Sequence, residues 1–248
     1  MKKISRLIAC ALLVTLPAGA QEYAEASEKP AEKTVILLNG SSYDFIFNWK
    51  KKPTESHWKG VGFAFSGLED LHGADLNPNS SYSIMLNLTD YTVPLSYHFL
   101  FVTGLGFDWS RYHFRGNTGL QYVDGVAGFF RDTERDYKSS KLLVYYATVP
   151  LMLEYQTKTG PHSHFFVSGG VEGLFKYYSK SQLDIRRPQG GLEKINYRNP
   201  NIPPLNVRLM LRAGFDHFSF FGYYQLFSMF ENGKGPDVRS FGIGLMLN

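Results

Sequence analysis

The stretch 205–215 constrains the fold more than any other part of the chain, because every second residue in it is apolar. The residues at odd positions form one wholly apolar face: Leu205, Val207, Leu209, Leu211, Ala213 and Phe215. The even positions carry Asn206, Arg208, Met210, Arg212 and Gly214. Successive side chains of a β-strand point to opposite faces, so this period of two predicts a strand whose two faces meet different surroundings.

Seven other stretches of the chain share this β-strand character. Counting all eight, we expect strands at 57–65, 82–95, 99–114, 141–155, 165–178, 205–215, 218–230 and 239–248. After the first 20 residues, no stretch has the periodicity of an amphipathic helix of useful length.

The connections between these strands alternate between long and short. The segments 115–140 and 184–204 are long, whereas the turns at 96–98, 158–161 and 216–217 are short. Outer-membrane barrels have long loops outside the cell, short turns in the periplasm and an even number of strands. The sequence therefore predicts an all-β fold, an eight-stranded antiparallel up-and-down transmembrane β-barrel at 57–248 with both chain ends in the periplasm.

Residues 1–20 have the three parts of an export signal peptide. A basic start at 2–6 precedes an apolar core at 7–16, and Ala18-Gly-Ala20 supplies the small residues of a cleavage site. A lipoprotein box ending at Cys10 is the alternative, but it would leave almost no apolar core before it. Cys10 is the only cysteine, so the exported protein is expected to have neither a disulfide nor thiol chemistry.

Residues 21–56 form a polar periplasmic extension before the predicted barrel. Within it, Asn39-Gly40 lies between two apolar runs, and this turn signal predicts a small hairpin at 34–47. The formal net charge of +4 includes Lys2, Lys3 and Arg6 of the signal, whose removal leaves 4 − 3 = +1. The remaining charges are spread along the chain, so the pI of about 9.0 does not indicate a nucleic-acid-binding protein.

A soluble, lipocalin-like barrel in the periplasm would show the same alternation with its apolar face turned inwards. The less apolar face of this chain is rich in glycine and serine, which suits the crowded interior of a narrow barrel. We therefore expect the apolar face to meet lipid, through Leu205, Val207, Leu209, Leu211, Phe241, Ile243, Leu245 and Leu247.

Aromatic residues at the predicted strand ends also favour the membrane barrel. They fit two interfacial girdles. These are Trp109, Tyr112, Phe114, Tyr137, Tyr177, Tyr178 and Phe230 near the long loops, and Tyr97, Phe99, Tyr155, Phe215 and Phe218 near the turns.

Short motifs along 34–248 resemble the PorT-like outer-membrane β-barrel family of Bacteroidetes. The matching pieces are His57-Trp-Lys-Gly60, Thr103-Gly-Leu-Gly-Phe107, Val149-Pro-Leu-Met-Leu-Glu154, Arg212-Ala-Gly214 and Gly233-Lys-Gly-Pro-Asp237. The resemblance lies in their order and spacing. It implies an outer-membrane barrel, it implies no catalytic activity, and members of the family include protein-secretion components.

Five charged residues fall on the predicted inner faces of the fourth, fifth and sixth strands: Glu154, Glu172, Lys176, Arg208 and Arg212. Charges inside a narrow barrel are costly unless they are paired. We expect an interior network whose pairs are Glu172–Arg208 and Glu154–Arg212. Such a network would hold the barrel shut, and the alternative is that these charges line a selective pore.

His162 and His164 could hold a metal on one turn, but two ligands without a nearby third give weak support for a metal site. No pattern brings serine, histidine and acidic residues together, so we assign no catalytic residue, cofactor or metal. We expect a non-enzymatic protein with a structural or partner-binding role in the envelope, in protein secretion or assembly. Its expected partners are outer-membrane lipid, the outer-membrane assembly machinery and an envelope protein, and not nucleic acid. The alternatives are a narrow passive channel for small solutes, a membrane-embedded enzyme and the soluble periplasmic barrel.

Overall fold

The computed structural model describes residues 33–38, 41–46, 55–69, 71, 75–96, 98–158 and 164–248. The chain divides into two units, Met1–Lys50 and Lys51–Asn248. The predicted signal peptide lies outside the described residues. In the first unit, strands β1 (Lys33–Leu38) and β2 (Ser41–Ile46) pair antiparallel, with Leu38 opposite Ser41. This hairpin lies in the stretch where the Asn-Gly signal predicts one.

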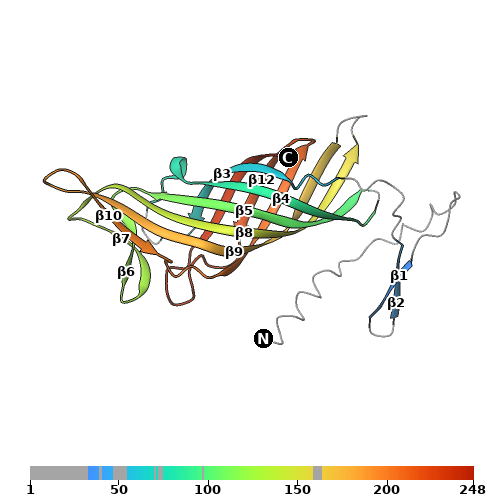
Figure 1. Ribbon diagram of the computed structural model, residues 1–248, viewed down its shortest axis with the longest axis horizontal. Helices are drawn as coiled ribbons and strands as arrows, with labels where there is room; N and C mark the ends of the chain where they lie inside the picture. Colours follow the sequence, from blue (N-terminus) through green and yellow to red (C-terminus); the bar gives the residue numbers. More distant parts are fainter. Residues whose placement is uncertain are drawn as a thin grey trace. The chain divides into compact units, whose positions relative to one another are not determined.

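The second unit is a closed β-barrel of eight strands. They are β3 (Gly60–Glu69), β4 (Tyr82–Pro94), β5 (Phe99–Phe114), β8 (Asp136–Lys158), β9 (His164–Arg186), β11 (Leu205–Phe215), β12 (Phe218–Gln225) and β13 (Arg239–Leu247). Each strand pairs antiparallel with the next, and pairing of β13 with β3 closes the sheet (Figure 1). The predicted eight-stranded antiparallel up-and-down barrel is thereby confirmed.

Helical structure contributes little to the described part of the chain. The 3-10 helix η1 (Pro78–Ser80) lies in the connection between β3 and β4. None of the described helical segments is long and apolar enough to cross a membrane.

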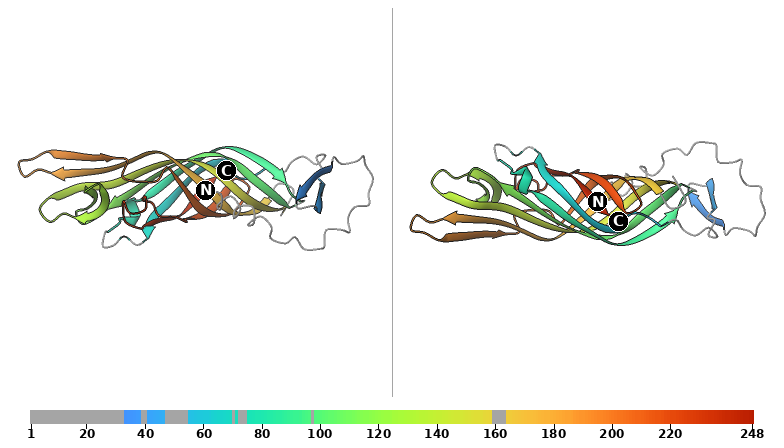
Figure 2. Two further views of the ribbon diagram at one scale, coloured as in Figure 1. Left: turned by 90° about the horizontal axis from the view of Figure 1, so that it is seen from below. Right: turned by 90° about the horizontal axis from the view of Figure 1, so that it is seen from above.

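The two long loops contain more strand than the sequence predicts. Strands β8 and β9 continue beyond the barrel as 23-residue strands, and β10 (Leu192–Arg198) pairs with the outer part of β9. The first long loop contains the hairpin of β6 (Thr118–Val123) and β7 (Val126–Arg131), and Figures 1 and 2 show β6, β7 and β10 gathered at one end of the unit. β10 and the outer parts of β8 and β9 are rich in polar residues, as a loop is, because strands outside a membrane need no apolar outer face.

We use the terms loop side and turn side for the barrel ends that carry the long and the short connections. The interior of the barrel holds two apolar clusters. The loop-side cluster contains Leu68, Tyr112, Phe114, Leu120, Ala127, Leu142, Val144, Tyr146, Leu174, Ile202, Met229, Phe230 and Val238. The turn-side cluster contains Trp58, Ala64, Met85, Leu100, Val102, Met152, Met210, Phe221, Tyr223 and Met246. On β5, Asp108 lies between the residues of the two clusters, so a charged layer separates them.

Candidate functional site

Arg208 is the centre of the charged layer inside the barrel. It lies on β11 directly opposite Glu172 of β9, and its Nε donates to Glu172 Oε2 at 2.5 Å. Its Nη1 donates to Oδ2 of Asp108 on β5. The side chains of Arg208, Asp108 and Glu172 are 4%, 0% and 1% exposed, so all three charges are removed from solvent. The guanidinium also lies over the ring of Tyr223, with Cζ 4.7 Å from its centroid.

The pair Glu172–Arg208 was predicted from the sequence, whereas Asp108 was not among the predicted interior charges. Strand β5 is not next to β11 in the barrel, so the contact between Asp108 and Arg208 crosses the lumen. A signal for Asp108 was present, because it shares the inner face of β5 with Ser110, whose Oγ donates to Asp108 Oδ1 at 2.7 Å. Register around the whole barrel was needed to connect it with Arg208.

Glu154 does not form the expected ion pair with Arg212. Ser168 of β9 lies opposite both residues, so a whole strand separates Glu154 on β8 from Arg212 on β11. Glu154 Oε1 instead lies 2.9 Å from Nδ1 of His57, whose ring stacks on Phe166 with centroids 4.0 Å apart. The carboxylate of Glu154 is 1% exposed, so a residue preceding the first strand supplies its partner inside the barrel.

Arg212 is held mainly by neutral oxygen atoms. Its Nη2 donates to the carbonyl oxygen of His57 at 2.6 Å and to Oδ1 of Asn248 at 2.7 Å. Its Cζ lies 5.3 Å from the centre of the Trp58 ring. The buried Nε and Nη1 atoms of Arg212 have no hydrogen-bond partner among the described residues. Arg212 thus links His57, just before the first barrel strand, to Asn248, just after the last one.

The segment 55–59 closes the turn side of the barrel. The sequence predicts that a strand begins at His57, but β3 begins at Gly60, and Trp58 is instead buried in the turn-side cluster at 1% exposure. Asn87 Nδ2 donates to the carbonyl oxygen of Trp58 at 2.9 Å, and Gln156 Nε2 donates to that of Glu55 at 2.9 Å. These bonds fix the backbone of the segment to side chains of β4 and β8.

Lys176 is separate from the charged layer. Its Nζ donates to Oδ1 of Asn199 at 2.6 Å and to the carbonyl oxygen of Ile202. It therefore anchors the connection between β10 and β11 at the loop side. The expected grouping of five interior charges is thus divided among three places, around Arg208, around His57 and at this connection.

The outer surface of the barrel is apolar along the strands. Seven of the eight expected lipid-facing residues are exposed, from 44% for Leu245 to 71% for Ile243, and Val207 is half-buried. Arg208 and Arg212, between them in sequence, are 3% and 1% exposed. A soluble barrel would place these two sets the other way round. The charges are inside and the apolar side chains outside, as in a barrel that spans a membrane.

Three of the expected girdle residues do not face outwards. Tyr112, Phe114 and Phe230 are 1%, 8% and 3% exposed and belong to the loop-side cluster. Their position near strand ends matches a girdle, but they share the parity of the inner face or lie in a connection that folds over it. The other described girdle residues belong to neither interior cluster. Among them, Tyr137 lies on the part of β8 that extends beyond the barrel. Tyr97 lies outside the described residues.

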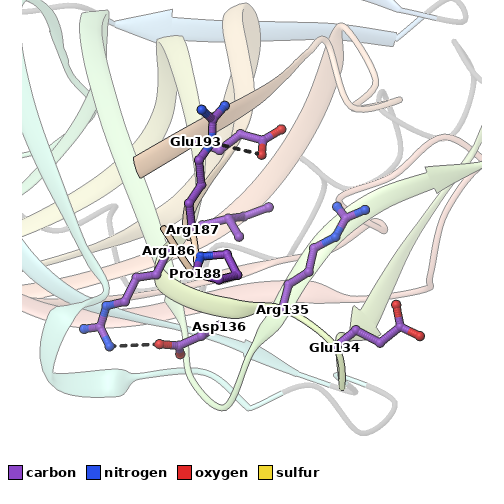
Figure 3. Close-up of a pocket in the computed structure, with 8 residues that line it drawn as sticks. Glu134, Arg135, Asp136, Arg186, Arg187, Pro188 and Glu193 are labelled. Carbon is purple, nitrogen blue, oxygen red and sulfur yellow. Dashed lines mark hydrogen bonds and ion pairs between the residues drawn. The ribbon is translucent and has the colours of Figure 1, made fainter. Parts of the chain in front are cut away.

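A hollow of about 480 Å³ lies at the tip of the β8–β9–β10 extension (Figure 3). Its charges neutralise one another, since Arg186 pairs with Asp136 at 2.9 Å and Arg187 with Glu193 at 3.6 Å. The hollow therefore does not point to a charged ligand.

Metal binding also finds no support in the described part of the chain. No group of three histidine, cysteine or acidic residues there could hold a metal ion. Of the candidate pair, His162 lies outside the described residues, and His164 is the first residue of β9.

No protein-family model matches the chain, and no curated protein matches it. Among solved structures, the crystal structure of Ail, the attachment invasion locus protein of Yersinia pestis, has 13% sequence identity and a TM-score of 0.33, covering 76% of this chain and 98% of that chain. The structure of Ail in complex with the heparin analogue sucrose octasulfate has 12% identity and a TM-score of 0.33, covering 76% and 94%. The strand pairing of the chain itself shows the barrel fold.

Proposed function

We propose that this chain is an integral outer-membrane β-barrel protein with a closed interior and a structural or partner-binding role in the envelope, and that it is not an enzyme. The observation that carries the proposal is the buried Asp108–Arg208–Glu172 layer between two apolar clusters. An eight-stranded barrel is only just wide enough for side chains to fill. Side chains that meet across the lumen leave no evident path for a solute.

The segment 55–59 supports the same conclusion at the turn side. Trp58 is buried among turn-side residues, and the His57 ring lies between Glu154 and Phe166. A passive channel would need this segment to leave the barrel and the Arg208 layer to separate. No contact among the described residues favours that alternative.

Conductance in a planar lipid bilayer tests the closed interior. The purified full chain is expected to give no conductance steps under conditions in which a general porin does. Regular steps from the wild-type protein would refute the closed interior. They would favour the narrow channel.

Heat modifiability and vesicle flotation test the membrane assignment. The folded barrel should migrate faster than the heated protein in a semi-native gel and should float with lipid vesicles. A protein that stays in the soluble fraction and shows no heat-dependent shift would exclude a membrane barrel. The signal-like residues 1–20 and the resemblance to PorT-like barrels support the outer membrane as its location.

The resemblance to PorT-like barrels also supports a partner in protein secretion or assembly. Cross-linking in intact cells followed by purification in detergent should recover an envelope protein in addition to the barrel-assembly machinery. Deleting residues 21–50 would test whether the periplasmic extension binds that partner, with the unmodified chain as control. Recovery of the assembly machinery alone would argue against an envelope partner and would indicate a purely structural role for the barrel.

A further inference from the structure

We propose that the outer face of the β5–β8–β9–β10 sheet binds the phosphate groups of an anionic lipid headgroup at the loop-side surface of the membrane. The site consists of Arg111, Lys141, Lys180 and Arg198, which we call the cationic row. The proposal rests on the membrane-spanning barrel proposed above and adds a ligand class to its outer surface.

Strand register brings these cations together. Arg111 lies opposite Leu143, Leu143 opposite Lys180, and Lys180 opposite Arg198, so one row crosses four strands. Lys141 is two residues from Leu143 on β8 and therefore points to the same outer face. The inner-face neighbours Tyr112, Leu142 and Ser181 are each no more than 1% exposed, which fixes the outward direction of the cations. The four residues are far apart in the sequence, and strand pairing brings them close together.

The row has no internal counter-charge. Within the described residues, none of the four cations forms an ion pair with a carboxylate. Lys180 and Arg198 are direct cross-strand partners, and like charges at such positions destabilise a sheet. An anion bound between them would remove this repulsion.

Arg111 also has unused hydrogen-bonding capacity. Its Nε is enclosed and has no hydrogen-bond partner among the residues that the structure describes, while its Cζ lies 5.5 Å from the ring centre of Tyr82. The guanidinium is thus oriented on an aromatic face and retains donors for an oxyanion. The nearest acidic residue on this face is Asp184, two rows further from the barrel on β9, where it accepts a hydrogen bond from Gln182 at 3.1 Å.

The position of the cationic row relative to the membrane surface identifies the source of the phosphate. One step closer to the barrel centre, Trp109, Tyr145 and Tyr178 form a row of cross-strand partners on the same face. The rings of Tyr145 and Tyr178 stack with centroids 5.1 Å apart. Aromatic residues of this kind lie at the membrane–water interface. Two residues along a strand span about 7 Å, so the cations lie at the level of lipid headgroups, and a lipid phosphate is favoured over a free anion.

Native mass spectrometry of the full chain tests the proposal, with phosphatidylglycerol as the anionic probe and phosphatidylcholine as the zwitterionic reference. The K180Q/R198Q variant removes two cations of the row. The matched control, R186Q/R187Q, removes two exposed arginines that already have carboxylate partners. Wild type and control should retain phosphatidylglycerol preferentially. The K180Q/R198Q variant should lose this preference by roughly 30-fold, since each cation near an anionic surface contributes about a factor of five.

The outcomes separate this inference from the proposed function. Equal lipid retention by K180Q/R198Q and R186Q/R187Q, with both variants showing the heat shift of a folded barrel, would refute the cationic row. Complete displacement of phosphatidylglycerol by millimolar inorganic phosphate would show a free-phosphate site and would also overturn the proposal. A wild-type chain that does not float with vesicles would instead overturn the membrane assignment.

Discussion

Replacing Arg208 by methionine should destabilise the barrel more than any other single change to its interior charges. Arg208 forms ion pairs with two carboxylates, Asp108 and Glu172, whose side chains are 0% and 1% exposed. Removing one partner of a buried ion pair costs about 3–5 kcal/mol, because the remaining charge stays buried without compensation. Here two carboxylates are left, so we expect about 5 kcal/mol, which corresponds to more than three powers of ten in the unfolding equilibrium.

Arg212→Met is the matched control for this experiment. Arg212 is as deeply buried but donates its hydrogen bonds to neutral oxygens of His57 and Asn248. Hydrogen bonds of a charged group contribute about 1.5–3 kcal/mol. Removing the unpartnered Nε and Nη1 atoms offsets part of this loss. We therefore expect about 1–2 kcal/mol for Arg212→Met, well below the effect of Arg208→Met.

Reversible urea unfolding in lipid vesicles, followed by tryptophan fluorescence, measures both changes in the free energy of unfolding. The triple variant R208M/D108N/E172Q should recover most of the stability lost in Arg208→Met, because no buried charge remains without a partner. The amide that replaces the carboxylate of Asp108 would keep an acceptor for Ser110, which donates to Asp108 in the wild-type protein. A cost below about 1 kcal/mol for Arg208→Met, or a triple variant no more stable than the single one, would refute the buried charge network.

Three further predictions concern the lipid face, the turn side and the loop side. Leu209→Arg places a charge on the outer face, where Leu209 is 46% exposed, and should cost about 2–4 kcal/mol near the bilayer centre. The folded fraction in a semi-native gel should fall for Leu209→Arg and not for the Leu209→Phe control, and normal assembly of the arginine variant would show that the faces are reversed. Trp58→Ala should lower the free energy of unfolding by about 3–5 kcal/mol, and a change below about 1 kcal/mol would show that segment 55–59 does not stabilise the barrel. Burial raises the pKa of Tyr122 to about 12, and burial together with its hydrogen bond to Asp132 raises the pKa of Tyr137 to about 12. Tyr122 lies on β6, and the Tyr137 hydroxyl accepts a hydrogen bond from Gln121 of β6, so the neutral form of each phenol stabilises the folded β6–β7 hairpin. This stabilisation is fully present below the ordinary pKa of about 10 and should be lost as the pH rises from about 10 through 12. An NMR titration with ring-labelled tyrosine, assigned with the two Tyr→Phe variants, would contradict this if both phenols ionise near their ordinary pKa of about 10.

The face of most strand residues could be predicted from the sequence alone, but Tyr112 and Phe114, expected in the outer girdle because they lie near a strand end, point inwards. Leu209 lies outside and Arg208 inside because consecutive side chains of a strand point in opposite directions, and this alternation depends only on local backbone geometry. The apolar odd positions of 205–215 therefore identified the outer face, and the arginines between them identified the inner one. The closed barrel followed from eight such stretches joined alternately by long and short connections.

Only the tertiary structure decided which residues meet. The partner of an inner side chain depends on the stagger of strands summed around the closed barrel, and this stagger has no local signature. For this reason Asp108 reaches Arg208 from a strand that is not adjacent to β11, while His57 replaces Arg212 as the partner of Glu154. The same register places Lys180 opposite Arg198 on an extension whose polar residues resemble a loop. The alternation of residues thus determined which face of a strand is the outer one, and barrel closure determined the neighbours of each inner side chain.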